Sequence, residues 1–170
     1  VGMGRIGKAF ARRCLAFGLK VLYTGPKPLP RADEALLNAA FLPLEELLPL
    51  SDFLSLHLPL TPESRHLLDR RRIGLMKPGS ILINTSRGPI VDEEALADSL
   101  LEGRLWGAGL DVFEQEPQIH PKLLLAERTV LLPHIGSATE ETRTRMAWMT
   151  VEALKETFAG RVPPFLVPPW

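Results

Sequence analysis

Arg87, Glu116 and His134 are the side chains of this 170-residue sequence whose types and positions could do chemistry together. Each stands a few residues beyond a short apolar run with the composition of a buried strand. Ligands of open parallel sheets bind outside the carboxyl ends of the strands. We therefore expect the three side chains to converge on one cleft.

The three residue types fit the interconversion of a keto acid and a hydroxy acid. An arginine can donate two hydrogen bonds to a carboxylate or a keto oxygen. A histidine can give a proton to a carbonyl as a hydride arrives, and a carboxylate beside it favours the charged ring and orients it. Plainer interpretations stay open: Arg87 as a structural ion pair, His134 as a helix cap, and Glu114 and Glu116 as surface charges.

The other histidines are expected to have no part in this chemistry. His57 lies on a predicted buried strand and should be a core or supporting residue, whereas His66 and His120 look like surface residues. No spacing of His, Cys, Asp and Glu predicts a metal site, and no G-x-S-x-G run predicts a hydrolase.

A glycine-rich turn opens the sequence. Gly2, Gly4 and Gly7 form G-x-G-x-x-G between Val1 and a helix-period segment. The first glycine permits a tight turn, the second lets the backbone approach a pyrophosphate, and the third lets the helix pack closely. The N–H groups at the helix start would then face the phosphates. The motif is weak alone, but its place before a helix predicts a dinucleotide site.

The choice between NAD and NADP depends on the end of the next strand. Dinucleotide folds often place an acid there for the ribose 2′-hydroxyl, but residues 23–27 contain none. Lys27 and Arg31 could instead meet a 2′-phosphate, which favours NADP over NAD. The alternative is that Lys27 is a solvated loop cation.

Short apolar runs alternate with helix-period segments along the chain, which predicts an α/β fold: a Rossmann-type doubly wound parallel sheet with a long C-terminal helix. Asp69 and Asp92 are expected as helix N-caps. Helices are expected at residues 5–17, 31–38, 44–48, 69–76, 93–102 and 138–159, and strands at 20–23, 40–42, 53–58, 80–84, 107–112 and 130–132.

The overall composition indicates which classes of binding partner and which cellular compartment to expect. Twenty basic residues balance twenty acidic ones, so bulk charge predicts neither a nucleic-acid nor a membrane partner. One cysteine, Cys14, and no membrane span or signal peptide predict a cytoplasmic protein. We expect residues 1–137 to form the nucleotide-binding domain, with a truncated first strand, and residues 138–170 to form a helix and an extended proline-rich tail.

Six ordered motifs resemble the D-isomer-specific 2-hydroxyacid dehydrogenases across essentially the whole chain. The glyoxylate/hydroxypyruvate reductase branch of that family is the most similar. The motifs are Gly2-Met3-Gly4-Arg5-Ile6-Gly7, Leu58-Pro59-Leu60-Thr61-Pro62-Glu63, Met76-Lys77-Pro78-Gly79, Asn84-Thr85-Ser86-Arg87-Gly88, Gly109-Leu110-Asp111-Val112-Phe113 and Pro133-His134-Ile135-Gly136-Ser137-Ala138-Thr139.

The resemblance implies a role for each site residue. Arg87 would bind the substrate carboxylate and keto oxygen, His134 would donate or accept the proton, and Glu116, not Glu114, would be its partner. Asp111 would lie at the nicotinamide end of the cofactor. The implied contacts to NAD or NADP are Gly2, Gly4, Arg5, Ile6, Gly7, Lys27, Pro59, Thr85, Asp111, His134, Gly136 and Ser137.

The resemblance also implies a substrate domain, absent from this sequence, on which residues 138–170 would pack. Without it we expect the chain alone to be inactive. It implies a homodimer formed through the nucleotide-binding domain, and a small 2-keto acid as substrate. The alternative function is a nucleotide-sensing interaction module, as in co-repressors that resemble these dehydrogenases.

Overall fold

The computed structural model describes residues 1–166, and the last four residues of the expected extended tail lie outside the described part. The chain divides into two compact units, Val1–His134 and Ile135–Trp170. This boundary lies slightly before the one expected after residue 137. Within residues 1–166, no helix has the length and apolar character needed to cross a membrane.

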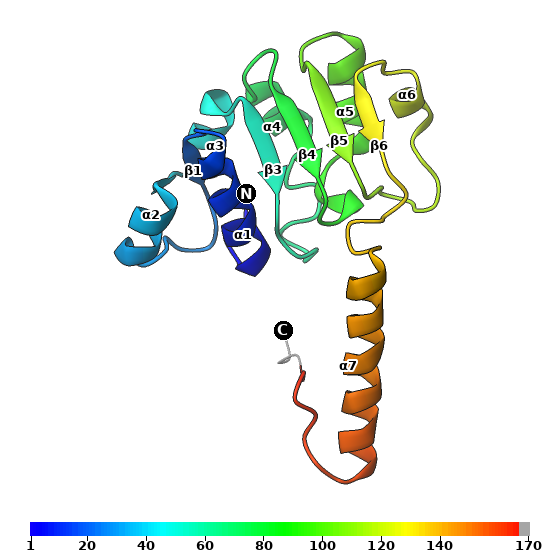
Figure 1. The fold of residues 1–170 in the computed structure, drawn as a ribbon. Coiled ribbons are helices and arrows are strands. Elements are labelled where there is room, and N and C mark those ends of the chain that lie inside the picture. The colour runs from blue at the N-terminus through cyan, green and yellow to red at the C-terminus, as the bar shows by residue number, and fades with distance from the viewer. Residues whose placement is uncertain (167–170) are drawn as a thin grey trace. The chain divides into compact units, whose positions relative to one another are not determined.

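Parallel strands form the centre of the first unit (Figure 1). Four of them pair in the order β3-β4-β5-β6, and β1 pairs with β2 in a second sheet. The strands are β1 (Val21–Tyr23), β2 (Ala39–Phe41), β3 (Phe53–Leu56), β4 (Ile81–Asn84), β5 (Gly107–Leu110) and β6 (Thr129–Leu131).

Val1 and Gly2 connect the two sheets. The amino group of Val1 donates to the Ser55 carbonyl at 2.7 Å, and the Val1 carbonyl accepts from the His57 amide at 2.8 Å. On the other side, the Gly2 amide donates to the Thr24 carbonyl at 2.9 Å. The spatial order is therefore β2-β1-Val1-β3-β4-β5-β6. Successive strands progress in opposite directions from the glycine turn, which is the doubly wound arrangement that the sequence predicts.

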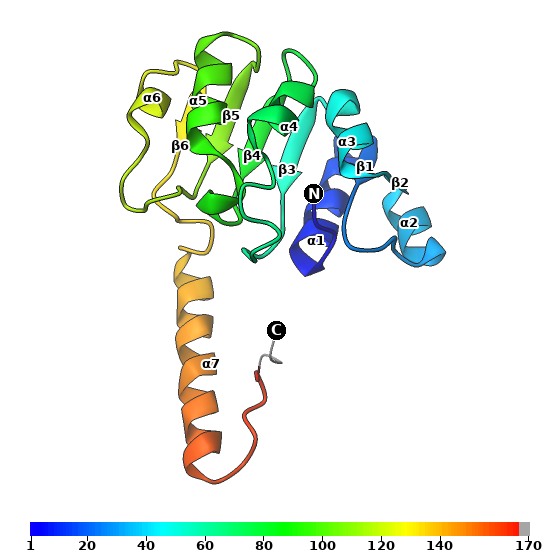
Figure 2. The same ribbon diagram turned by 180° about the vertical axis from the view of Figure 1, so that it is seen from behind.

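Helices lie on both sides of this sheet. Figure 2 shows α3, α4 and α5 in front of it, and α1 lies on the other side, in front in Figure 1. The Asp69 side chain accepts from the Arg72 amide and the Asp92 side chain from the Ala95 amide, so both predicted N-caps are confirmed. The helices are α1 (Arg5–Ala16), α2 (Arg31–Leu37), α3 (Leu44–Leu47), α4 (Arg70–Leu75), α5 (Glu93–Leu101) and α6 (Pro121–Leu124), with 3-10 turns at Leu48–Leu50 and Gly88–Ile90.

The core of the first unit contains alternate residues of the strands. Leu56 of β3, Leu82 of β4 and, from helix α5, Leu96 are fully buried. Each such side chain contributes about 1.5–3 kcal/mol of transfer free energy. One expectation is wrong in part: the strand expected at residues 53–58, which was predicted to be buried, has only alternate residues of β3 buried. Phe53 is 54% exposed and lines a groove between β1 and β3.

The second unit contains α7 (Glu140–Phe158). The Thr139 side chain caps this helix by accepting from the Thr142 amide at 3.2 Å, so the helix begins two residues later than expected. None of its residues is buried, and Trp148 and Phe158 are among its exposed apolar side chains.

Candidate active site

The glycine turn leaves no room for side chains at two of its three glycines. Gly2 has a φ of 85°, and a Cβ there would lie 2.3 Å from the His57 carbonyl oxygen. A Cβ on Gly7 would lie 2.2 Å from the Gly2 carbonyl oxygen. Both distances are far below van der Waals contact, so the turn and the close packing of α1 require glycine at these positions.

Gly4, in contrast, faces open space. A Cβ there would meet no atom within 4 Å, and no side chain caps the start of α1. The N–H groups of the first helical turn have no partner within the helix and carry a partial positive charge. Arg5 is exposed and Ile6 is 71% exposed beside them. The turn therefore fits the pyrophosphate of a dinucleotide.

Hydrogen bonds from Tyr23 fix the loop that follows β1. Its buried hydroxyl donates to the Glu34 carboxylate at 2.7 Å and accepts from the Leu29 amide at 2.6 Å. Burial raises the pKa of this hydroxyl, which stays protonated at neutral pH. The loop between Tyr23 and Leu29, which includes Lys27, is thus held by hydrogen bonds of one side chain.

Both acids of this region are already engaged. Glu34 is bound to Tyr23, and Asp33 pairs with Lys8 at 2.6 Å. Lys27 and Arg31 are exposed. The arrangement offers positive charge near the end of β1 and no unpaired carboxylate from these two acids.

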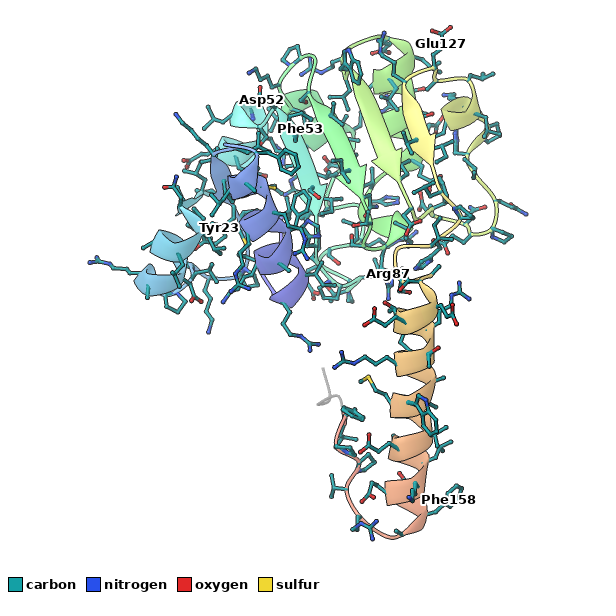
Figure 3. All side chains as sticks on the ribbon, viewed as in Figure 1. Tyr23, Asp52, Phe53, Arg87, Glu127 and Phe158 are labelled. Carbon is teal, nitrogen blue, oxygen red and sulfur yellow. The ribbon has the colours of Figure 1, made fainter. Side chains whose placement is uncertain are left out.

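Arg87 stands on a turn fixed by Asn84, the last residue of β4. The Asn84 side chain is 1% exposed, and its Nδ2 donates to the Arg87 carbonyl at 2.9 Å. Its Oδ1 accepts from the Ser86 amide at 3.0 Å. Arg87 and Thr85 are exposed, and Figure 3 shows Arg87 at the edge to which the strand arrowheads point. The guanidinium is thus presented at the carboxyl edge of the sheet.

Glu116 and His134 form a pair at this edge. His134 Nδ1 and Glu116 Oε2 are 2.8 Å apart, and Glu116 Oε1 accepts from the Phe113 amide at 3.1 Å. The hydrogen bond from His134 holds the pKa of the Glu116 carboxyl below its usual range, and the charge of Arg87 contributes in the same direction. The structure therefore pairs Glu116 with His134 directly, and Arg87 lies near enough for its charge to act on the Glu116 carboxyl.

Two of the plainer interpretations are wrong. Thr139, not His134, caps the C-terminal helix. Glu114 is not a solvated charge either, because its Oε1 binds Arg65 at 3.1 Å and His66 at 2.7 Å. His66, expected as a surface residue, thus belongs to a hydrogen-bonded group with Glu114 and Arg65, and no local sequence signal indicates this.

The remaining expected cofactor contacts follow strands β3, β5 and β6 along the chain. Asp111 is 4% exposed, and its amide donates to the Asn84 carbonyl at 3.0 Å. Pro59 is exposed, and its carbonyl accepts from Ser64 Oγ at 2.8 Å. Gly136 and Ser137 belong to the second unit. The contact of these residues with a cofactor stays a prediction.

His57 is a supporting residue. Its Nε2 lies 2.9 Å from Ser55 Oγ, and its ring lies 4.9 Å from that of Phe10. Burial lowers the pKa of His57 to about 4. The ring is therefore neutral at physiological pH and packs behind the glycine turn.

Comparison with known proteins agrees with this geometry. Residues 1–136 match the family model described as "D-isomer specific 2-hydroxyacid dehydrogenase, NAD binding domain". A glyoxylate reductase of Thermococcus litoralis is 48% identical over 167 residues, 98% of this chain and 50% of the relative. The chain thus spans about half the length of the curated relatives it matches.

Solved structures are similar as well. A protein of Thermus thermophilus is 51% identical, with a TM-score of 0.86 over 96% of this chain and 50% of that chain. A D-lactate dehydrogenase of Aquifex aeolicus, solved with NAD and lactic acid, is 36% identical, with a TM-score of 0.85 over 94% of this chain and 52% of that chain.

Proposed function

We propose that the whole protein reduces a small 2-keto acid, because this chain belongs to the D-isomer specific 2-hydroxyacid dehydrogenases as their NAD-binding domain. Glyoxylate and hydroxypyruvate are the substrates we propose, because a curated relative that covers nearly all of this chain is a glyoxylate reductase. A bound nicotinamide would supply the hydride. The residues of this chain would bind the substrate and move the proton.

The pairing of His134 with Glu116 carries this proposal. Nδ1 of His134 faces the Glu116 carboxylate at 2.8 Å, which leaves Nε2 as the nitrogen that can face a substrate. With Nδ1 bonded to the carboxylate, Nε2 is the nitrogen that can carry a proton and give it to the keto oxygen. In the reverse reaction the neutral ring would take the hydroxyl proton back.

Arg87 would bind the substrate in the same cleft. Its guanidinium is exposed at the carboxyl edge of β4, and its charge acts on Glu116. A guanidinium can donate parallel hydrogen bonds to the carboxylate of a 2-keto acid. Such a bond would place the keto carbon beside the imidazole.

We further propose NADP(H) in preference to NAD(H). Asp33 and Glu34 are bound to Lys8 and Tyr23. They are thus not available for a ribose 2′-hydroxyl, and the exposed Lys27 could attract a 2′-phosphate instead.

A homodimer formed through this domain is also proposed. Four exposed apolar side chains lie on or directly beside β5, α6 and β6, at one end of the sheet order, and exposed apolar side chains often mark protein interfaces. They are Trp106, Leu124, Leu125 and Val130, all more than half exposed. Light scattering on the purified protein tests this, and a monomer at micromolar concentration would contradict it.

The experiment for the proposed reaction uses the full-length gene product. Initial rates would be measured with NADPH and NADH on glyoxylate, hydroxypyruvate and pyruvate. We expect oxidation of NADPH with glyoxylate or hydroxypyruvate, and slower rates with NADH. Absence of nucleotide oxidation with all three acids would refute the proposed reaction, and no observation made above favours a sensing module instead.

A further inference from the structure

Glu93 is a buried carboxylate that the proposed reaction does not use. It is the first residue of α5, directly after the Asp92 cap, and it is 5% exposed. Burial raises the pKa of this carboxyl. Burying an acid costs free energy unless hydrogen bonds satisfy its oxygens, so the partners of Glu93 indicate what the site requires.

The partners are backbone amides of one segment. Glu93 Oε1 accepts a short hydrogen bond from the Glu114 amide. Hydrogen bonds from the amides of Glu114 and His120 act against the effect of burial on the pKa of Glu93. The charged or titratable groups that act on Glu93 are those of Glu114, which raises its pKa, and His120, which lowers it. One carboxylate thus contacts the segment 114–120 near both of its ends.

Glu116 lies between those two amides. Its own carboxylate joins the Phe113 amide, at 3.1 Å, to the His134 ring, at 2.8 Å. The amide of Phe113 is therefore held by Glu116, and the next amide along the chain is held by Glu93. A shift of this backbone would move the Glu116 carboxylate with it.

Two further contacts restrict the backbone at Phe113 and Glu114. The Cβ that Gly88 lacks would lie 1.9 Å from the Phe113 carbonyl atoms, so the turn after Arg87 abuts this segment directly. The Glu114 side chain is tied to Arg65 and His66. These contacts involve packing of Gly88 or the Glu114 side chain. The hydrogen bond to the Glu114 backbone amide comes from Glu93.

We propose that Glu93 is a positioning residue, whose carboxylate fixes the backbone of residues 114–120 so that Glu116 stays within hydrogen-bonding distance of His134. The inference deepens the proposed function and rests on it for its catalytic consequence. Its structural part concerns the protein without cofactor or substrate and can be measured separately.

Three variants distinguish the effect of the Glu93 hydrogen-bond acceptor from that of its charge and from that of any acid at the start of α5. Glu93→Ala removes both the acceptor and the charge, whereas Glu93→Gln removes the charge and keeps a side-chain carbonyl. Glu94→Ala is the matched control, because Glu94 is the next residue of α5, 59% exposed and paired only with Lys122 among the described ion pairs. The variants are made in the 170-residue chain and in the full-length gene product.

The first readout is nuclear magnetic resonance of the wild-type 170-residue chain. We expect a scalar coupling across the hydrogen bond between the Glu114 amide nitrogen and the Glu93 carboxyl carbon. Amide exchange at Glu114 should be faster in Glu93→Ala by about tenfold or more, and unchanged in Glu94→Ala. Absence of the coupling overturns the proposal even if Glu93→Ala fails to fold.

The second readout is the pKa of the Glu116 carboxyl, from the chemical shift of its carboxyl carbon. If the segment loosens, the bond to His134 weakens, and the pKa of Glu116 rises in Glu93→Ala relative to Glu93→Gln. A loss of stability alone would not move this value in the folded state. Equal pKa values of Glu116 in these two variants would overturn the proposal.

The third readout is activity of the full-length gene product. We expect kcat to fall about 10- to 100-fold in Glu93→Ala, with KM for the nucleotide unchanged. Glu93→Gln should recover most of this loss, and Glu94→Ala should match the wild type. If the wild type has no activity, the proposed function fails, while the two resonance readouts still decide whether Glu93 positions Glu116.

Discussion

Gly88→Ala perturbs the contact between the Arg87 turn and the segment that carries Glu116. The added Cβ would lie 1.9 Å from the carbonyl carbon and oxygen of Phe113 and 2.5 Å from the Glu114 nitrogen. The backbone of Phe113 must therefore retreat by about 1 Å or more before the methyl group fits. Since Glu116 binds both the Phe113 amide and His134, this retreat should separate Glu116 from His134.

The expected loss follows from that displacement. A misplacement of about 1 Å costs on the order of 100-fold in rate, so kcat of the full-length gene product should fall by about that factor. Overpacking should also lower the free energy of unfolding by about 1–3 kcal/mol. The KM for NADPH should change little, because the glycine turn lies on another part of the edge.

Gly74→Ala is the matched control. Gly74 is an exposed residue of α4, and a Cβ there would meet no atom within 4 Å. Alanine is the better helix former by roughly 0.5–1 kcal/mol, so this variant should be slightly stabilised and fully active. Initial rates and thermal unfolding are measured for both variants. A Gly88→Ala protein with the wild-type melting temperature and a kcat within about twofold of wild type would refute the reasoning.

Three further predictions concern the glycine turn, the loop after β1 and His57. Gly4→Val should raise the dissociation constant of NADPH about tenfold or more by covering the free N–H groups of α1, as read from fluorescence energy transfer; unchanged binding would place the phosphates elsewhere. Replacing Lys27 and Arg31 with alanine should raise KM for NADPH about tenfold and leave that for NADH unchanged, whereas equal effects on both would contradict a 2′-phosphate contact. His57 should lower stability as the pH falls from 6.5 to about 4, because the unfolded chain takes up a proton that the folded site does not. The loss is on the order of 3 kcal/mol, and urea unfolding of His57→Gln should show a shallower fall; parallel curves would rule out His57 as the cause.

The architecture was predictable because its signals are local. The helix after the Asp92 cap begins where the sequence indicates, whereas the helix capped by Thr139 begins two residues later than expected. The gathering of Arg87, Glu116 and His134 at one edge of the sheet was predictable because parallel strands all end at the same edge. The four-residue helix α6 was not predicted, although α3, which has the same length, was expected at residues 44–48.

Which glutamate pairs with His134 could not be predicted from the residue types and spacing alone. Glu114 and Glu116 follow the same strand, and only the resemblance to a known family distinguished them. In the structure the Glu114 carboxylate turns to His66, whereas that of Glu116 turns to His134. The role of Glu93 could not be predicted, because an acid in the first turn of a helix is common for reasons of the helix dipole alone.

The most direct test of the central claim is a single-turnover measurement on the full-length gene product and its His134→Gln variant, with NADPH and glyoxylate. If His134 gives the proton that accompanies hydride transfer, the rate of that step should fall at least about 100-fold. The dissociation constant of NADPH should stay within about twofold. A variant that transfers hydride as fast as the wild type would contradict the account.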